Sequence, residues 1–289
     1  MDAFIYGWEG ASPEDATFLE EDELKLSIVI PTLNQGETIR DTLLSIIQQN
    51  YKNFEIIVMD GGSHDSTLEV IKQYRQYIAH FESRDDGGQS AAINKGFEFA
   101  TGDIFAWINS DDFYLPNAFL NIVKAFKQCH DAAIVVGSGH VVTWDCKFLK
   151  RIEAIEMNRE NLLGWHNDKW IMQQSCFWSA DIWKKSGGVD QDLHLLMDYD
   201  LWLRFANLGK SITVKNDIAA MRYYDQTKTI SLKTKMSEEE AYVYAKNNAF
   251  PELRALVRKL KKENDELLSA VERIENRLIT RVSKRLGLI

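Results

Sequence analysis

From Leu26 to about Gln128 the chain alternates short apolar runs with longer amphipathic segments. The apolar runs are rich in isoleucine, valine and aromatic residues and have the length of buried strands. The segments between them repeat apolar residues every three or four positions, as helices that cover a sheet do. The predicted strands are 26–31, 54–60, 78–83 and 104–110, and the predicted helices are 38–49, 66–76, 89–102 and 116–128. This alternation predicts an α/β fold with a parallel sheet.

The second half of the chain has a less regular pattern. Residues 132–145 read as two strands that turn at the Gly137-Ser138-Gly139 step. A helix is predicted from about Asp198, and five of the eight tryptophans lie between residues 165 and 202. We interpret this half as an antiparallel and helical addition to the sheet, with the tryptophans in its core.

Polar clusters follow all four predicted strands of the first half. In a parallel sheet, ligands bind in the crevice beyond the carboxyl ends of the strands. Helix capping explains some of these residues, since serine, aspartate and asparagine suit N-cap positions, but it does not require so many. The clusters are Thr32 and Asn34, Asp60-Gly61-Gly62-Ser63, Arg84 to Gln89, and Asn109 to Asp112.

Two adjacent aspartates, Asp111 and Asp112, stand at the end of the apolar run IFAWINSDDFYLP. Ionised carboxylates at this spacing repel each other, and a hard divalent cation offsets that repulsion through oxygen ligands. The alternative is a turn whose aspartates cap the following helix. The sequence therefore predicts either a metal site or a capped turn here.

The composition is that of a soluble globular protein, with 289 residues, 45% of them hydrophobic and 27% charged. Its three cysteines form no closely spaced pair, so we expect buried thiols in a reducing compartment. No apolar stretch has the length of a membrane span, and residues 1–24 are acidic, unlike a secretory signal. We expect a cytoplasmic protein. The net charge of −9 argues against nucleic-acid binding.

Three motifs, in order, carry a resemblance to family 2 glycosyltransferases. They are SIVIPTLNQGETIRDTLLSIIQQNYKNFEIIVMDGGSHDST, GQSAAINKGFEFATGDIFAWINSDDFYLP and QQSCFWSADIWKKSGGVDQDLHLLMDYDLWLR. The resemblance spans about residues 25 to 225. It implies a GT-A fold with a nucleotide-sugar-binding half at 25–130 and an acceptor-binding half at 131–235, preceded by an acidic leader at 1–24. It also implies Mn²⁺ or Mg²⁺, inversion at the anomeric centre, a UDP-sugar as the first choice of donor, and a glycan or lipid-linked glycan as acceptor.

The resemblance also implies roles for individual residues. Asp111 corresponds to the second, metal-binding aspartate of the family's Asp-x-Asp motif, whose first aspartate is replaced here by Asn109. Because asparagine contributes no charge, Asp112 is expected as a further metal ligand. Lys95 has a second interpretation as a solvated helix lysine, and Asp65 is expected to cap a helix. Tyr224 stands where the family often has histidine. The expected donor-binding residues are Thr32, Asn34, Asp60, Asp86, Gln89, Lys95, Asn109, Ser110, Asp111 and Arg222.

By the same resemblance, the general base falls on Asp198, in Met197-Asp198-Tyr199-Asp200. Met197 replaces the family's glutamate, and Asp200 is the nearest rival for the catalytic role. An acid at a helix start also interacts favourably with the helix dipole, which explains Asp200 without catalysis. Gln174 and Trp178 are expected in the acceptor cleft, and any exposed tryptophan of the 165–202 group would suit the face of a sugar ring.

Beyond the resemblance, residues 236–289 are predicted to be helical. A heptad pattern predicts a coiled coil over about 252–282, and an asparagine at a core position suggests a homodimer with a fixed register. The alternative is a helix packed on its own domain. The last residues mix bases with aliphatics, which favours peripheral contact with the inner face of the plasma membrane. The core positions are Val257, Asn264, Val271 and Leu278, alternating with Leu253, Leu260, Leu267 and Ile274.

Two other classes of function are alternatives to a sugar transferase. A nucleotidyltransferase also places nucleotide phosphates over a parallel sheet, but the segment PTLNQGET lacks the glycine-rich, basic phosphate loop that such enzymes carry. A transferase-like scaffold that dimerises through its tail would have no use for Asp60, Asp111 and Asp198 together. The sequence therefore favours the enzyme.

Overall fold

The structure is a computed structural model that describes residues 24–164, 170–224 and 233–285. It divides into one unit that ends at Lys233 and a second that begins at Thr234. Apart from Leu24, the acidic leader predicted at 1–24 lies outside the described residues, as do Trp165 and the last four residues of the tail.

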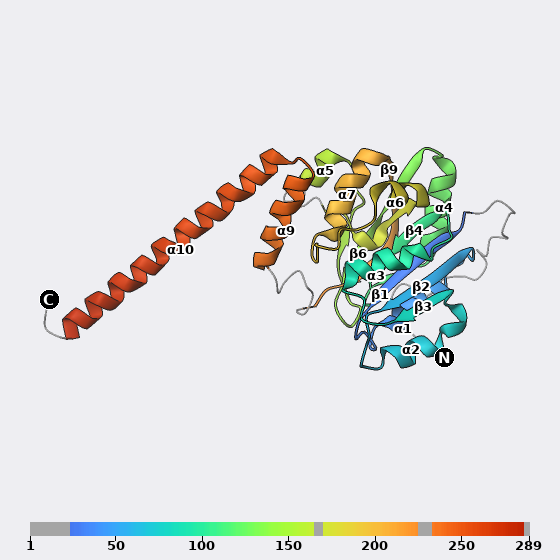
Figure 1. The fold of residues 1–289 in the computed structure, drawn as a ribbon, viewed down its shortest axis with the longest axis horizontal. Helices are drawn as coiled ribbons and strands as arrows, with labels where there is room; N and C mark the ends of the chain where they lie inside the picture. Colours follow the sequence, from blue (N-terminus) through green and yellow to red (C-terminus); the bar gives the residue numbers. More distant parts are fainter. Residues whose placement is uncertain (1–23, 165–169, 225–232, 286–289) are drawn as a thin grey trace. The chain divides into compact units, whose positions relative to one another are not determined.

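The parallel half of the sheet follows the predicted alternation. Its strands lie side by side in the order β3-β2-β1-β4, all parallel (Figure 1). Each connection between them passes through a helix, as parallel pairing requires. The strands are β1 (Leu26–Thr32), β2 (Phe54–Asp60), β3 (His80–Ser83) and β4 (Ile104–Trp107), and the helices are α1 (Ile39–Ile47), α2 (Thr67–Gln73), η2 (Arg75–Tyr77), α3 (Gln89–Glu98) and α4 (Ala118–Gln128). The prediction for residues 26–128 is confirmed.

The same sheet continues into the second half in the order β4-β8-β6-β9-β5, with β7 paired to β6. Antiparallel pairing enters here, as predicted. The strands are β5 (Phe113–Tyr114), β6 (Ala132–Val142), β7 (Phe148–Ile152), β8 (Cys176–Ser179) and β9 (Lys210–Arg222), and the helices are α5 (Arg159–Leu163), η4 (Gln173–Ser175), α6 (Ala180–Ser186) and α7 (Met197–Leu208).

The turn predicted at Gly137-Ser138-Gly139 is wrong, because β6 runs unbroken through it. The glycines serve close packing against β9 instead. A Cβ atom at Gly137 would lie 2.1 Å from Cγ1 of Ile218, and one at Gly139 would lie 2.6 Å from the carbonyl oxygen of Ala219. The register between β6 and β9 shifts at these residues, as at a β-bulge.

Strand directions bring distant loops to one edge of the sheet. Because β8 is antiparallel to both β4 and β6, the strands β4 and β6 run in the same direction. β9 is parallel to β6. The carboxyl ends of β1, β2, β4, β6 and β9 therefore share one edge, which also carries the turn between β6 and β7.

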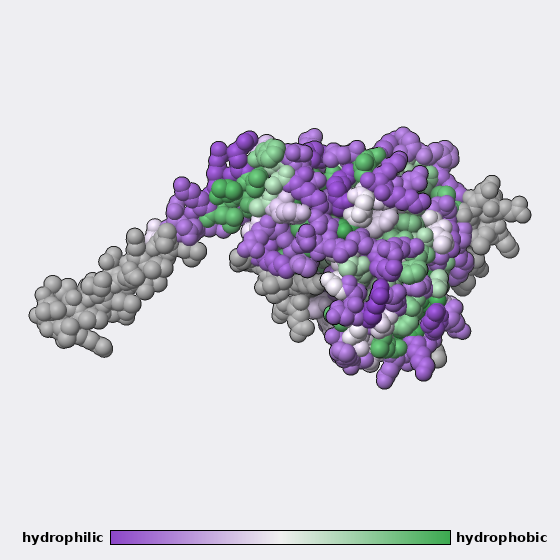
Figure 2. Space-filling model, in the orientation of Figure 1, coloured by the Kyte–Doolittle hydropathy of each residue, from purple (hydrophilic) through white to green (hydrophobic). Residues whose placement is uncertain are grey.

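Aromatic residues fill the core between α3, β4, β8 and α7. The Trp178 ring lies 5.3 Å from Trp107 and 5.6 Å from Trp202, and Trp107 stacks on Trp202 at 5.8 Å. The core interpretation of the tryptophan-rich segment is confirmed for Trp178, Trp183 and Trp202. On the face that Figure 2 shows, hydrophilic residues cover most of the surface, with smaller apolar patches between them. All three cysteines are free thiols, of which Cys176 is buried and Cys129 and Cys146 are partly exposed.

The second unit contains α9 (Lys233–Lys246) and α10 (Phe250–Arg285), a single helix of 36 residues. Val257 and Leu260, two of the predicted heptad core residues, are exposed on α10. Within the described part of the chain, no helix has the length and apolar character needed to cross a bilayer. Helix formation agrees with the heptad pattern, and the coiled coil stays a prediction.

Glu55 ties three segments together at the amino edge of the sheet. Its carboxylate accepts hydrogen bonds from Lys25 Nζ at 2.7 Å, Ser27 Oγ at 2.6 Å and the Thr101 main-chain N–H at 2.6 Å. Burial raises the pKa of Glu55, but these hydrogen bonds outweigh burial and hold its pKa below the ordinary value.

Replacing Glu55 by Gln should lower the free energy of unfolding by about 1.5–3 kcal/mol at pH 7, because hydrogen bonds to a charged acceptor are lost. Since the folded-state pKa lies below the unfolded one, this contribution is present at neutral pH and disappears as the pH falls below about 4. Urea unfolding from pH 7 to 3.5 measures it, with exposed Glu69→Gln as the control. A difference between wild type and Glu55→Gln that does not shrink on acidification would contradict this account.

Candidate active site

Asp60 ends β2 and organises the loop that follows it. The carboxylate is buried, and its Oδ2 accepts hydrogen bonds from the main-chain N–H groups of Gly62 and Ser63 at 3.1 and 3.0 Å. The same oxygen accepts one from Ser83 Oγ at 2.6 Å, and Oδ1 accepts one from Ser63 Oγ. The loops after β2 and β3 are therefore joined through one carboxylate.

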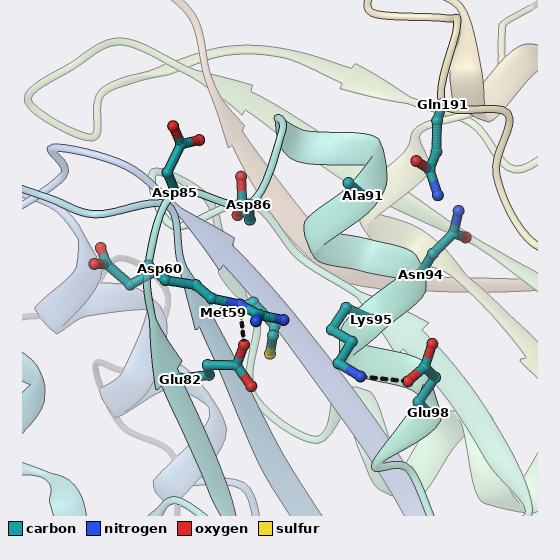
Figure 3. A pocket seen from close by; sticks show the side chains of 11 residues that line it. Met59, Asp60, Glu82, Asp85, Asp86, Ala91, Asn94, Lys95, Glu98 and Gln191 are labelled. Carbon is teal, nitrogen blue, oxygen red and sulfur yellow. Dashed lines mark hydrogen bonds and ion pairs between the residues drawn. The ribbon is translucent and has the colours of Figure 1, made fainter.

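A pocket of about 270 Å³ opens beside Asp60, between the ends of β2 and β3 and the helix α3 (Figure 3). Three of the predicted donor-binding residues, Asp60, Asp86 and Lys95, line it. Lys95 Nζ lies 2.6 Å from Glu98 Oε2, so the lysine has a carboxylate partner on its own helix. The pocket is also lined by Met59, Glu82, Arg84, Asp85, Ala91, Asn94, Glu98 and Gln191.

Asn34 joins the loop after β1 to the loop after β2. Its main-chain N–H donates to Ser63 Oγ at 2.8 Å, and its side-chain oxygen accepts from the His64 N–H at 2.9 Å. The residue has φ of 52°, in the left-handed region that asparagine tolerates. Thr32 is buried, and its hydroxyl has no hydrogen-bond partner within the described part of the chain.

Asn109 and Gln89 connect β4 to the start of α3. Gln89 Nε2 donates to Asn109 Oδ1 at 2.8 Å. The next residue on α3, Ser90, donates to the Leu193 carbonyl at 2.8 Å, in the segment that leads into α7. Ser110 is buried. The structure therefore brings the loop after β4 and the start of α7 to the same end of α3.

The adjacent aspartates Asp111 and Asp112 have opposite environments. Asp112 is only 2% exposed, and its two oxygens accept hydrogen bonds from Gln174 Nε2 at 2.6 Å and the Arg222 main-chain N–H at 2.9 Å. Burial, followed by the Asp111 charge, raises the pKa of Asp112 well above its ordinary value. Asp111 is partly exposed, and its Oδ2 accepts from Tyr224 Oη at 2.8 Å.

This geometry leaves one of the two predicted metal ligands in place. Both oxygens of Asp112 are engaged inside the protein, so we do not retain Asp112 as a ligand. Neither aspartate caps α4, whose N-cap residue is Asn117. No group of three or more His, Cys, Asp or Glu side chains in the described residues forms a metal cage. A single carboxylate at Asp111 still fits Mg²⁺ or Mn²⁺, which take one or two carboxylates and complete their shell with substrate phosphates and water.

Arg222 lies in the interior and supports the loop that carries Asp111. The side chain is buried, and Arg222 Nη2 forms an ion pair with Asp41 of α1. Nη1 donates to the Asp111 carbonyl at 2.7 Å, and the guanidinium lies 5.0 Å from the centre of the Phe113 ring. The expected contact of Arg222 with the donor is therefore replaced by a positioning role. The role of Asp41 could not be predicted from the sequence around it, because its partner, Arg222, lies far along the chain on β9.

Asp198 lies in the first turn of α7 and is partly exposed. One of its oxygens accepts a hydrogen bond from the Tyr199 N–H at 2.8 Å. Burial, followed by the negative charge of Asp198, raises the pKa of the Cys176 thiol, so Asp198 lies near the start of β8. The sulfur of Met197, which stands in place of the family's glutamate, lies 2.9 Å from Ser90 Oγ.

Asp200, the rival of Asp198, is 0% exposed and paired with a cation. Its Oδ2 accepts from Arg204 Nη2 at 2.8 Å and from Arg204 Nε at 3.0 Å. The Nη1 group of Arg204 donates to the carbonyls of Ser186 and Gly188 at 2.6 and 2.7 Å. Asp200 therefore anchors α7 to the end of α6 and does not reach a substrate.

Gln174 and Trp178, expected in the acceptor cleft, lie in the interior. Gln174 is buried and holds Asp112, and Trp178 is fully buried in the aromatic core. Direct contact of Trp178 with an acceptor does not agree with this position. The sequence did not indicate that the residues after Gln173 form η4 and then β8, which lies in the sheet between β4 and β6.

The family described as "Glycosyl transferase family 2" matches residues 27–180, which is more than half of the chain. The chain therefore belongs to glycosyl transferase family 2, a family of sugar transferases. Membership of this family decides for a sugar transferase and against the nucleotidyltransferase alternative.

Among curated relatives, an uncharacterised glycosyltransferase of Rickettsia typhi is 27% identical over 227 residues, covering 75% of this chain and 69% of its own length. The putative glycosyltransferase EpsE of Bacillus subtilis is 33% identical over 122 residues, covering 41% of this chain and 44% of its own length. Other Rickettsia relatives are covered over 58% and 30% of their length. The chain thus spans between about a third and two thirds of these relatives.

Among solved structures, S. aureus TarS 1-349 in complex with UDP-GlcNAc aligns with a TM-score of 0.62 at 16% identity, covering 77% of this chain and 66% of that one. The mannosyltransferase PcManGT from Pyrobaculum calidifontis, in complex with GDP-Man and Mn²⁺, aligns with a TM-score of 0.57 at 16% identity, covering 80% and 65%. These alignments confirm the GT-A fold.

Because Asp198 and Asp200 have different environments, replacing each by alanine should lower the free energy of unfolding by different amounts. Asp200→Ala should lower the free energy of unfolding by about 3–5 kcal/mol, because it leaves a half-buried Arg204 cation unpaired. Asp198→Ala should cost less than about 1 kcal/mol, the size of a helix-dipole interaction. Urea unfolding followed by tryptophan fluorescence reports on this unit. Equal losses for the two variants would show that the assignment of Asp200 to structure is mistaken.

Proposed function

We propose that the chain transfers a sugar from a nucleoside-diphosphate sugar to a hydroxyl group of a glycan or lipid-linked glycan, with inversion at the anomeric carbon. One observation carries the proposal. Two acid pairs, Asp111 with Asp112 and Asp198 with Asp200, share one arrangement. In each pair one carboxylate, Asp112 or Asp200, is buried and held by the protein, while the other, Asp111 or Asp198, is partly exposed. In this proposal Asp111, of the first pair, acts at the leaving diphosphate, and Asp198, of the second pair, acts on the acceptor hydroxyl.

The donor is proposed to lie along the carboxyl edge of the sheet. The base and ribose lie against the loops after β1 and β2 and the pocket beside Asp60, and the diphosphate lies near Asp111. A bound Mg²⁺ or Mn²⁺ would supply charge stabilisation for the departing diphosphate. Asp111 would hold it, and Arg222 and Asp112 keep Asp111 in place. The UDP-GlcNAc of TarS and the GDP-Man and Mn²⁺ of the mannosyltransferase support this class of donor.

Asp198 is proposed to act as the general base. Its carboxylate takes the proton of the acceptor hydroxyl as that oxygen forms a bond to the anomeric carbon. The bond from this carbon to the diphosphate oxygen breaks on the opposite face, so the configuration inverts and the diphosphate leaves with the electron pair. A positioned base of this kind contributes about 10²- to 10⁴-fold in rate.

Asp198→Asn should therefore lower the rate of transfer at least about 100-fold and leave donor binding intact. Asp111→Asn should instead abolish the stabilisation by UDP or GDP that depends on Mn²⁺, measured as a thermal shift. Exposed Asp192→Asn, in the loop before α7, is the matched control and should behave as wild type in both assays. Normal transfer by Asp198→Asn would remove the base assignment, and Mn²⁺-dependent stabilisation of Asp111→Asn would remove the metal assignment.

For the tail, we propose a homodimer formed by α10 through its heptad positions. The exposed apolar side chains of Val257 and Leu260, three residues apart at successive core positions of the heptad pattern, support it. Replacing both by Glu should halve the mass measured by light scattering at micromolar concentration, and Lys259→Gln should not. A monomeric wild type would contradict the dimer. Flotation with anionic vesicles tests the peripheral membrane contact separately. Membrane contact should be unchanged in the double variant, because the basic residues at the end of the tail are kept.

A further inference from the structure

Trp144 is the tryptophan that the structure exposes to solvent, among those whose side chains are described. It is 43% exposed, whereas Trp170 is partly exposed and Trp107, Trp178, Trp183 and Trp202 are buried. Single exposed apolar side chains are common on protein surfaces, so the case for Trp144 rests on where it lies and on its contacts with the proposed site. Trp144 lies outside the tryptophan-rich segment, in the turn between β6 and β7, at the carboxyl edge of the sheet.

The turn holds Trp144 in a fixed place. The Cys146 N–H donates to the Thr143 carbonyl at 3.0 Å, and the Thr143 N–H donates to the Lys147 carbonyl at 2.9 Å. The Lys147 N–H in turn donates to Thr143 Oγ1 at 2.9 Å. A ring carried by such a turn is ordered before a ligand arrives, which lowers the entropy cost of binding.

Two contacts tie this turn to the loop that carries Asp111. The Trp144 ring lies 5.0 Å from the Tyr224 ring at an interplanar angle of 72°, and Tyr224 Oη donates to Asp111 Oδ2 at 2.8 Å. In addition, Arg222 Nη2 donates to Cys146 Sγ at 3.3 Å while its Nη1 binds the Asp111 carbonyl. Trp144 is therefore one side chain removed from the residue proposed to hold the diphosphate end of the donor.

The surroundings of Trp144 combine apolar and charged groups. Asp145 and Lys147, an exposed ion pair at 2.9 Å, belong to the same turn, and Phe148 is exposed on β7. A pyranose ring has an apolar face of C–H groups and a rim of hydroxyls, so it matches a flat indole beside hydrogen-bonding groups.

We propose that Trp144 is a platform for a pyranose ring of a substrate, either the sugar of the donor or the first sugar of the acceptor. This inference rests on the proposed function and extends it to a residue outside the family's motifs. The shared chemistry is stacking of the sugar face on the indole, and the two sources of the ring are separated by experiment.

The test observes the eight tryptophan indole N–H signals of the full chain by NMR, with the Trp144 signal assigned from its loss in Trp144→Phe. The probes are UDP, UDP-GlcNAc, GDP and GDP-Man, each with Mg²⁺, which is diamagnetic and does not broaden nearby signals, and the methyl glycosides of common hexoses. A shift of the Trp144 signal with a nucleotide sugar but not with its nucleotide identifies the donor sugar. A shift with a methyl glycoside identifies the acceptor sugar.

Steady-state kinetics supply a second readout. Trp144→Ala should raise KM for the substrate whose ring lies on the indole by about three- to tenfold, with kcat within about twofold. Trp144→Phe should recover most of this loss, and Leu149→Ala, at an exposed position of the same hairpin outside the proposed platform, should have no effect. Thermal denaturation should show that all three variants stay folded.

The outcomes separate this inference from the proposed function. Nucleotide binding at Asp111 with an unmoved Trp144 signal and wild-type kinetics for Trp144→Ala would overturn the platform alone. A Trp144 signal that moves with UDP or GDP as much as with the sugar nucleotides would overturn it as well, in favour of a nucleotide contact. Absence of any nucleotide binding would overturn both.

Discussion

The buried carboxylate of Asp112 is the constraint on which the candidate site depends. It is held by Gln174 and by the main chain of Arg222, and Thr42 of α1 donates to the Asp112 carbonyl at 2.6 Å. An acid so far from solvent is costly unless it is well hydrogen-bonded, so these partners fix its position. Because Asp112 is fixed inward, the preceding residue, Asp111, is left at the edge of the sheet.

The same arrangement occurs at the start of α7. Asp200 is withdrawn into an ion pair with Arg204, and Asp198, two residues earlier, stays partly exposed. In both places a buried acid gives rigidity and a partly exposed acid, proposed to take part in the reaction, lies close to it in the chain. Preorganised groups of this kind reorganise little during a reaction, which is how enzymes stabilise developing charge.

The first half of the fold was predictable because its signals are local. Strands of β-branched residues alternate with amphipathic helices from Leu26 to Gln128, and polar residues fall at the strand ends. The course of β6 was not predictable. In the sequence Gly137 and Gly139 are typical of a turn, and only the structure shows that they allow close packing against Ile218 and Ala219 of β9. The resemblance already favoured Asp111, but setting Asp112 aside as a metal ligand needed tertiary contacts, as did the interior positions of Gln174, Trp178 and Arg222. Adjacent residues with the same chemistry differ only in what the fold places around them.

A structure of the chain with a nucleotide sugar and Mn²⁺ tests the central claim most directly. The account predicts that a carboxylate oxygen of Asp111 coordinates the cation, that Asp112 keeps its contacts with Gln174 and Arg222, and that Asp198 faces the side of the anomeric carbon opposite the diphosphate. A cation bound by Asp112 with Asp111 turned away, or a donor whose anomeric carbon is remote from Asp198, would contradict it.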